Sequence, residues 1–300
     1  MSSIFKTLFT AAAAESSTPS PFSLSMLPAN THSLYLNIGS HLNPVKPPAN
    51  ESIAVIAFEP ILHAKLVPQE RLFVVPAAVA GHCGLAMMQP YAKATGSASL
   101  SAPAKSSKWN QDKLPPVVVP VISFSQVLHS VGSRPVWFLK TDMQGHDFSA
   151  ISSVPCDVLR SKVHYLMSEV YYGGVNTYAN ISNDYCADLL PHLLGCDYEP
   201  IALEPTRIGA FHNLHGGGEA AARRFCAQPQ ARGHPASNMG RSAGMRETNA
   251  YFRLRGSSLP PPTTNDWQQM EAQRDAKGRP WPVAQSSPSA PSASPSRTTP

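Results

Sequence analysis

The chain has 300 residues, of which 42% are hydrophobic and only 14% are charged, and its formal net charge is +5. This length allows one domain of ordinary size with tails, and it is enough to bury a hydrophobic core. The 30 prolines, about twice the usual share, predict disordered flanks, and no apolar run approaches the roughly 20 residues of a membrane span.

Residues 1–30 show no sustained hydrophobic periodicity, and we predict that they form a disordered leader. The first part of this leader lacks arginine, and Lys6 interrupts any signal-peptide core. We therefore predict a cytoplasmic location, with organellar targeting by the leader as the alternative.

Two short apolar runs, residues 33–38 and 53–58, are predicted to be parallel strands, since strands buried on both faces read as continuous apolar runs. Gly39 follows the first run and Glu59 follows the second. Ligands of open α/β sheets bind beyond the carboxyl ends of strands, where a glycine lets the backbone approach and a carboxylate can bind both ribose hydroxyls. The pair predicts a nucleoside-cofactor site. The crossover between the runs leaves little room for a helix, because it contains Pro44, Pro47 and Pro48.

The next elements are predicted from apolar runs and from the residues that separate them. Residues 61–67 should form a short helical turn, residues 71–75 a third strand, and residues 84–91 an extended segment of a smaller antiparallel excursion. Residues 92–116 are rich in Ser, Ala, Lys and Pro and should form a long loop. Long loops in compact domains are usually functional or disordered, which makes this one a candidate lid.

The second half of the domain alternates strands and helices. Extended residues 117–122 lead to Ser123, which should cap a helix over residues 124–130. The further predicted elements are strands at 136–140, 163–170, 198–203 and 249–254, and helices at 147–152 and from Ser182 or Asn183 to Leu194. This order predicts a single α/β domain over residues 31–255.

The most informative polar motif follows the predicted strand 136–140 and contains Asp142, Gln144 and His146. α/β enzymes hold their chemistry at the carboxyl ends of strands. Asp142 could orient a substrate hydroxyl or amine, and His146 could act as a general base near neutral pH. The structural alternative is a strand-to-helix turn that Asp147 caps.

Glu169 ends the next predicted strand at the same expected edge, facing either the pocket or solvent. A metal cluster of Asp142, His146 and Glu169 would lack the close ligand pair, such as H-x-x-x-H, that metal sites show, and so no metal is predicted. The sequence contains no serine nucleophile elbow, phosphate loop or kinase signature.

Residues 207–248 are rich in Gly, Ala and Arg and are predicted to be a flexible insertion before the last strand. Between Arg207 and Arg255 lie eight arginines, no lysine and two glutamates, so the remainder of the chain is close to neutral. A basic patch can attract nucleic acid, anionic lipid or phosphate, but without interleaved aromatic residues a solvated loop is favoured over a nucleic-acid site. Residues 256–300, rich in Pro and Ser, are predicted to be a disordered tail.

The five cysteines are odd in number and show no C-x-x-C spacing: Cys83, Cys156, Cys186, Cys196 and Cys226. Such scattering argues against a disulfide framework and against a zinc site. It fits a reducing compartment.

The motifs also occur in a characteristic order along residues 31–255. The pieces are Leu34–Ser40, Ala57–Pro60, Val75–Val79 with Gly84, Val121–Phe124, Leu139–Asp147, Ser168–Val170 and Asn249–Phe252. This series resembles the FkbM-type S-adenosylmethionine-dependent methyltransferases. The resemblance implies a Rossmann-like class I methyltransferase sheet, mostly parallel with an antiparallel last strand, and methyl transfer, usually to an oxygen of a sugar or small metabolite.

The resemblance also implies S-adenosylmethionine as the cofactor and a small-molecule acceptor substrate. It places Glu59 on the ribose, Gly39 and Ser40 beside the amino-acid end, and Asn37, Pro60 and Ala78 among the other cofactor-binding residues. On the acceptor side, we predict substrate contacts for Gln144 and Glu169, and Asp142 and His146 of the polar motif are the catalytic candidates.

The sequence departs from the family pattern at three points. Asn37 stands where the first strand usually carries an acidic residue, the prolines shorten the first helix, and Gln144 replaces the carboxylate of the usual Asp-x-Glu-Gly. These departures support a second hypothesis, in which a catalytically weakened nucleoside-binding protein of the same fold engages an anionic partner through its Arg-rich insertion. No pattern predicts the identity of the acceptor or an oligomeric state.

Overall fold

The computed structural model describes residues 22, 24–40, 47–48, 50–61, 70–91, 98–103, 113–172, 178–203, 218–228 and 247–262. Several predictions therefore lie outside the described residues. They concern most of the leader, the helical turn after Ile61, most of the first crossover and the tail beyond residue 262.

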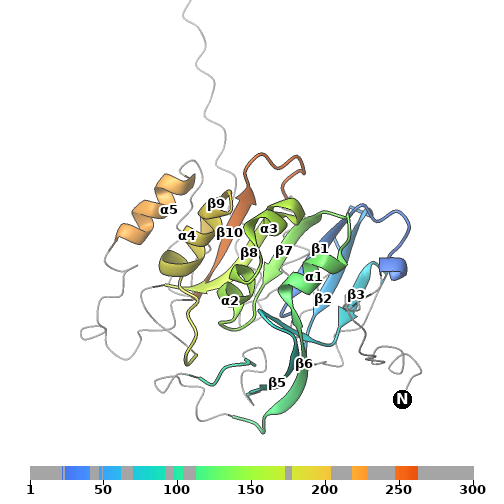
Figure 1. Cartoon of the computed structure of the whole chain (residues 1–300). Helices are drawn as coiled ribbons and strands as arrows, with labels where there is room; N and C mark the ends of the chain where they lie inside the picture. The colour runs from blue at the N-terminus through green and yellow to red at the C-terminus, as the bar shows by residue number, and fades with distance from the viewer. Residues whose placement is uncertain are drawn as a thin grey trace, which may run out of the picture.

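The centre of the molecule is a seven-stranded sheet with the order β3-β2-β1-β7-β8-β10-β9 (Figure 1). Six strands run parallel, and β10 runs antiparallel between β8 and β9. This arrangement confirms the predicted Rossmann-like sheet with an antiparallel last strand. The strands are β1 (Ser33–Ile38), β2 (Ile53–Phe58), β3 (Leu72–Val75), β7 (Val136–Thr141), β8 (Val163–Tyr171), β9 (Tyr198–Leu203) and β10 (Glu247–Leu254).

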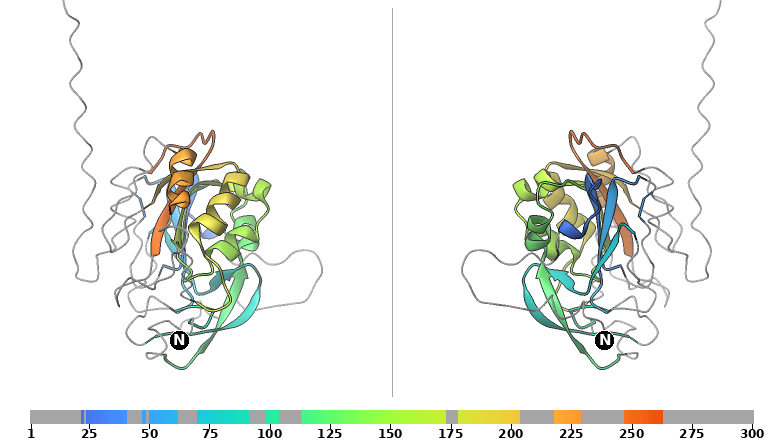
Figure 2. Two further views of the ribbon diagram at one scale, coloured as in Figure 1. Left: turned by 90° about the vertical axis from the view of Figure 1, so that its left-hand side faces the viewer. Right: turned by 90° about the vertical axis from the view of Figure 1, so that its right-hand side faces the viewer.

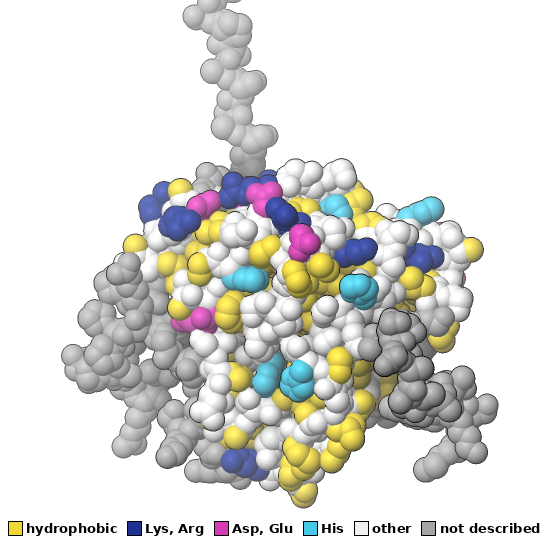
Figure 3. Space-filling view, viewed as in Figure 1, with side chains coloured by type: hydrophobic (Ala, Val, Ile, Leu, Met, Phe, Trp, Pro, Cys, Tyr) yellow, Lys and Arg dark blue, Asp and Glu magenta, His cyan; other side chains and the backbone are white. Residues whose placement is uncertain are grey.

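A second, three-stranded sheet lies beyond the carboxyl ends of β1 to β3 (Figure 1). It contains β4 (Ala78–Ala80), β6 (Val117–Ser123) and β5 (Gly84–Met88), in that order. β5 pairs antiparallel with β6, as predicted for the smaller excursion. One face of this sheet exposes the hydrophobic side chains of Leu85, Met87 and Val118. Figure 3 shows hydrophobic side chains gathered at the lower end of the molecule.

The helices gather on one face of the large sheet (Figure 2). They are α1 (Phe124–Ser130), α2 (Asp147–Ser152), α3 (Cys156–Lys162), α4 (Leu190–Gly195), which continues the π-helical turn η5 (Tyr185–Leu189), and α5 (Gly218–Ala227); a 3₁₀ turn, η2 (Leu24–Met26), precedes β1. Ser123 caps α1 as predicted, since its side chain accepts a hydrogen bond from the Gln126 amide. Asp184, rather than Ser182 or Asn183, caps η5 by accepting from the amides of Cys186 and Ala187.

Helix α5 lies within the segment predicted to be flexible, and the flexible interpretation is wrong for residues 218–227. Its first turn contains Glu219, which pairs with Arg223 one turn later and with Arg255 after β10. Phe225 is buried and joins the core under the helices. The i,i+4 ion pair and the buried aromatic side chain both help to hold this helix against β9.

The side chains of the sheet alternate between two cores. Leu34, Leu36 and Ile38 of β1 face the helices, whereas Tyr35 packs on the opposite face with Trp137 and Tyr165. The first residues of the predicted tail close this second face: Trp137 Nε1 donates to the Pro260 carbonyl at 2.8 Å, and the Tyr165 hydroxyl donates to the Leu259 carbonyl at 2.9 Å.

The cysteines are paired, and the prediction that they form no disulfides is wrong. Cys156 bonds to Cys196 and Cys186 bonds to Cys226, while Cys83 is free and exposed. Each pair is 40 residues apart in sequence, so only the packing of α3, α4 and α5 brings the sulfurs together. Disulfides persist mainly in oxidising compartments, and the cysteines therefore give no support for a reducing one.

In the described ranges, no helix is long and apolar enough to cross a membrane.

Candidate functional site

A cavity open to solvent lies at the carboxyl ends of the parallel strands. It is formed by the residues after β1, β2 and β7 and by β4, together with Ala98 and Leu100 of the predicted lid loop. Four of the predicted cofactor-binding residues line it, as do two of the predicted acceptor-side residues: Gly39, Glu59, Pro60, Ala78, Asp142 and Gln144. Parallel α/β sheets bind ligands at this edge.

Gly39 allows the turn after β1 to pass directly against the turn after β7. Its φ angle is +78°, and a Cβ atom added there would lie 1.9 Å from the Asp142 carbonyl oxygen. The Asp142 amide in turn donates to the Ile38 carbonyl at 3.0 Å. A residue without a side chain is therefore required at this point, both by backbone conformation and by space.

Glu59 is the first charged residue after β2, and its carboxylate is almost completely buried. One carboxylate oxygen, Oε1, accepts a hydrogen bond from the Ile61 amide at 3.0 Å. This bond holds the carboxylate at the cavity wall, which Glu59 helps to form. A buried carboxylate in this position is suited to bind the two hydroxyls of a ribose.

Asn37 and Ser40 lie at the carboxyl end of β1 and are buried, but they are not among the residues that line the cavity. Within the described part of the chain, neither amide atom of Asn37 nor the Ser40 hydroxyl has a hydrogen-bond partner. Buried polar groups are normally satisfied. The two residues therefore lie behind the Gly39 turn, and the structure does not bring their polar atoms to the cavity.

The polar motif after β7 forms a hydrogen-bonded cluster on the other side of the cavity. The Gln144 side-chain amide donates to Asp142 at 2.8 Å and to Glu169 at 3.2 Å, and so links the two carboxylates. Lys140, buried at the end of β7, pairs with Asp142 at 3.3 Å. The structure thus brings together three of the four predicted acceptor-side residues.

Two residues that the sequence did not single out hold Gln144 in place. The Tyr178 hydroxyl donates to Gln144 Oε1 at 2.7 Å, and the Ser99 hydroxyl donates to the Gln144 carbonyl at 2.9 Å. Gln144 itself has a left-handed backbone, with φ +52°. A strained conformation that is fixed by partners from two distant segments is typical of a functional site. Lys140 is the last residue of the predicted strand 136–140, whereas Tyr178 has no local sequence signal.

His146, the second catalytic candidate, lies apart from this cluster. It is not among the residues that line the cavity, and its Nε2 lies 2.9 Å from the Ser101 hydroxyl of the predicted lid loop. Burial, with a smaller contribution from the nearby His82, lowers the pKa of His146. The imidazole is therefore neutral at neutral pH and is held by the loop, whereas Asp142 faces the cavity.

Asp147, at the start of α2, is fully buried, and its Oδ1 accepts from the Met143 amide at 3.1 Å. Burial, and then repulsion from Asp142, raises the pKa of Asp147 to about 7. Because the folded protein keeps a proton that the unfolded chain loses near pH ~4, we expect stability to fall as pH rises from about 4 to 7. The loss should be on the order of 4 kcal/mol, since one pKa unit corresponds to about 1.4 kcal/mol.

Urea unfolding at pH 5 and pH 8 measures this effect. Asp147→Asn keeps an oxygen acceptor but does not titrate, and it should remove most of the pH dependence. Asp157→Asn, at an exposed position, should leave the dependence unchanged. If wild type and Asp147→Asn show the same pH dependence, Asp147 is not the group that titrates.

The charged side chains of the Arg-rich segment form ion pairs along the upper edge of the molecule (Figure 3). Arg223 and Arg255 bind Glu219, and Arg253 binds Glu199. Three of the four arginines that the structure describes between positions 207 and 255 are therefore paired with carboxylates. This pairing weakens the hypothesis of an anionic partner bound by the described part of the insertion.

The comparisons with known proteins agree with the geometry of the site. The methyltransferase FkbM domain matches residues 37–200, more than half of the chain. No curated protein and no solved structure gives a significant match. The matched range begins in β1, ends in β9, and includes every predicted site residue. The chain belongs to the FkbM methyltransferase family.

Proposed function

We propose that this methyltransferase uses S-adenosylmethionine to methylate an oxygen atom of a small metabolite or sugar. The observation that carries the proposal is one cavity that joins two kinds of residue: Gly39 and Glu59 on one side, and the Asp142–Gln144 cluster on the other. The first pair suits a nucleoside, and the second suits a hydroxyl-bearing acceptor. The cavity also lies at the strand edge where parallel α/β sheets bind ligands.

On the cofactor side, Glu59 would bind the ribose hydroxyls, and Pro60 and Ala78 would form the wall beside it. The Gly39 turn would leave room for the amino-acid end, and Asn37 and Ser40 stay weaker candidates because they are buried and do not line the cavity. The cofactor supplies a methyl group on a positively charged sulfur. The protein has to hold the acceptor oxygen in line with it, because methyl transfer depends chiefly on an aligned near-attack geometry.

On the acceptor side, Asp142 is the best-placed group to orient a hydroxyl and accept its proton. Lys140 pairs with Asp142 at 3.3 Å and orients its carboxylate at the cavity. Gln144 and Glu169 would bind further hydroxyls of the acceptor. His146 stays a weaker candidate, because the Ser101 contact holds its ring away from the cavity-lining set.

The test uses S-adenosylmethionine with a labelled methyl group and full-length protein. The protein is incubated with a cell extract separated into a small-molecule fraction and a macromolecular fraction, with heat-denatured protein as the control. We expect label in the small-molecule fraction, in a form that resists the mild treatments that cleave methyl esters. Label confined to macromolecules would overturn the proposed substrate class, and no transfer in either fraction would favour the non-catalytic binding protein.

The cellular location stays a prediction, with the cytoplasm as the primary hypothesis and an organelle as the alternative. Expression of the full-length chain with a fluorescent protein at its carboxyl end would distinguish the two.

A further inference from the structure

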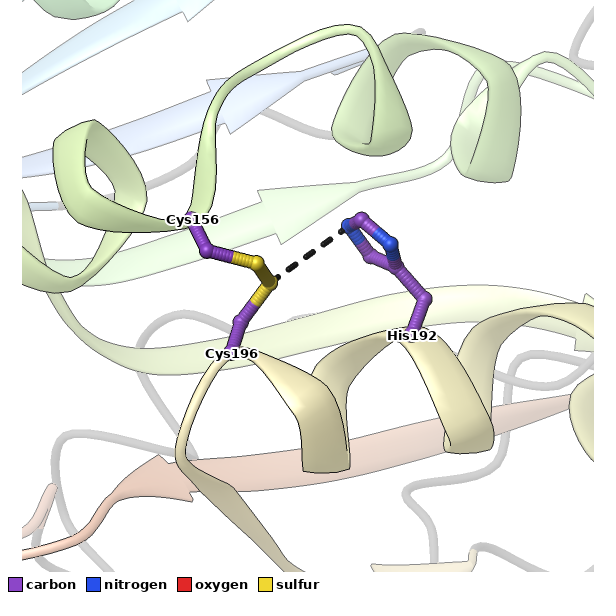
Figure 4. A group of neighbouring side chains, drawn as sticks. All are labelled: Cys156, His192 and Cys196. Carbon is purple, nitrogen blue, oxygen red and sulfur yellow. Dashed lines mark hydrogen bonds between the residues drawn. A yellow bond between two sulfur atoms is a disulfide. The ribbon is translucent and has the colours of Figure 1, made fainter.

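We propose that Cys156, His192 and Cys196 form a binding site for a thiophilic divalent cation of the Zn²⁺ class when the disulfide between the two cysteines is reduced. Figure 4 shows the side chains converging from the start of α3 and from α4, with the imidazole facing the sulfurs. One ligand atom of each residue lies within 4.8 Å of the other two. Two thiolates and an imidazole are a usual protein ligand set for zinc.

The spacing of the ligand atoms suits a tetrahedral cation. His192 and Cys196 are four residues apart, on α4 and its carboxyl-terminal cap, and so project from the same side. The His192 Nε2 atom lies 3.7 Å from the Cys196 Sγ. Tetrahedral zinc, with bonds of about 2.0–2.1 Å to nitrogen and about 2.3 Å to sulfur, places these two ligand atoms about 3.6 Å apart. The first two ligands therefore need little rearrangement.

Cys156 supplies the third ligand once the sulfur–sulfur bond is broken. Its Cα atom lies 4.9 Å from that of Cys196, so the two sulfurs can separate by side-chain rotation to the roughly 3.8 Å that tetrahedral zinc requires. A dithiol reductant converts the disulfide to two thiols and is itself oxidised to a cyclic disulfide. Cation binding then releases the two thiol protons to solvent, and two metal–sulfur bonds and one metal–nitrogen bond form.

The surroundings of the cluster leave one coordination position open. Cys196 is buried, whereas Cys156 and His192 are half-buried, so a cation and one water molecule can reach the cluster from solvent. The Phe148 ring packs edge-on against His192, with centroids 5.8 Å apart, and limits rotation of the imidazole. Cys196 lies just before β9, at the amino end of the parallel strands. The cluster shares no residue with the cavity lining, and we assign it a structural role.

The second cysteine pair provides an internal control. Cys186 and Cys226 are also 40 residues apart and bonded, but in the described part of the chain they belong to no group of three metal-ligand atoms. Reduction should thus leave one pair that can be bridged again by a cation and one pair that cannot.

The experiment uses full-length protein that is reduced anaerobically with a dithiol, freed of reductant and titrated with Co²⁺ alone. We expect one equivalent of Co²⁺ to give a near-ultraviolet sulfur-to-cobalt charge-transfer band and the strong visible bands of a tetrahedral site. Zn²⁺ should displace the cobalt and abolish both. Untreated, oxidised protein should give neither band.

Variants test whether the cobalt absorption bands come from this cluster. His192→Ala should weaken Co²⁺ binding by about 100-fold or more, because loss of even an outer-shell partner costs about 10–100-fold. The double variant Cys186→Ser/Cys226→Ser should bind Co²⁺ as wild type does. Far-ultraviolet circular dichroism confirms that each variant is folded, with His192→Gln as a milder substitute. Three results would overturn the site: no band in reduced wild type, an unchanged band in folded His192→Ala or His192→Gln, or loss of the band in the folded Cys186/Cys226 variant.

Discussion

Removing either disulfide is expected to lower the free energy of unfolding by about 4 kcal/mol, from the loss of a constraint on the unfolded chain. Each bond closes a loop of 40 residues in sequence separation. Because the two loops overlap, the combined loss should be smaller than the sum. A total stability of about 5–15 kcal/mol is usual, so the doubly reduced protein should fold with a much smaller margin of stability.

The positions of the bonds explain why both matter. Cys186 lies in the first turn of η5 and Cys196 caps the end of α4, so one continuous helical segment is fixed at both ends. Cys226 fixes α5 to that segment, and Phe225 beside it packs edge-on against Tyr172 and Tyr185. Loss of the Cys186–Cys226 bond should therefore release α5 first.

Urea unfolding of Cys156→Ser/Cys196→Ser and of Cys186→Ser/Cys226→Ser measures the two contributions. Cys83→Ser, at the free and exposed cysteine, is the matched control and should unfold as wild type does. Limited proteolysis should cut the Cys186/Cys226 variant near α5 before any other site. An unfolding midpoint that does not move on reduction would show that neither bond constrains the protein.

Replacing Gly39 by alanine is expected to cost about 3 kcal/mol of stability and to weaken cofactor binding by more than about tenfold. A left-handed backbone costs an L-residue about 1–2 kcal/mol, and overpacking adds about 1–3 kcal/mol. The added Cβ would meet the Asp142 carbonyl oxygen at 1.9 Å. The turns after β1 and β7 would be forced apart, and both turns line the cavity.

Gly256→Ala separates the cost of the left-handed backbone from the cost of the steric clash. Gly256 has nearly the same backbone angle, φ +71°, but a Cβ atom there would meet nothing within 4 Å. This variant should lose only the conformational part, about 1–2 kcal/mol, and should bind cofactor as wild type does. Equal behaviour of the two variants in urea unfolding and in binding would show that the close approach at Gly39 has no consequence.

The strands could be predicted from the sequence because a parallel strand buried on both faces is a continuous apolar run. All six residues of β1 and of β2 are buried, and their ends coincide with the predicted ones. Helix α3 was missed because it has seven residues, no side-chain cap and one buried residue, Leu159. Two turns with a single buried position give no measurable periodicity.

Some residues of the candidate site could likewise be predicted from the sequence, and others could not. Gly39, Glu59 and Asp142 follow the ends of strands, so their convergence at one edge could be deduced once the strands were known. Tyr178 and Ser99 reach Gln144 from segments 34 and 45 residues away in sequence. The disulfide partners are likewise joined only by tertiary packing. Contacts of this kind leave no spacing pattern in one sequence.

The most direct test of the central claim is calorimetric titration of S-adenosylmethionine into wild type, Glu59→Ala and Glu51→Ala. Glu51 is exposed and precedes β2, whereas Glu59 follows the same strand and lines the cavity. We predict that wild type and Glu51→Ala bind with the same affinity and that Glu59→Ala binds about 100-fold more weakly. Hydrogen bonds to a charged group are worth about 1.5–3 kcal/mol each, and about 1.4 kcal/mol is tenfold. Wild type that binds no S-adenosylmethionine would contradict the account, and unchanged binding by Glu59→Ala would contradict the ribose assignment.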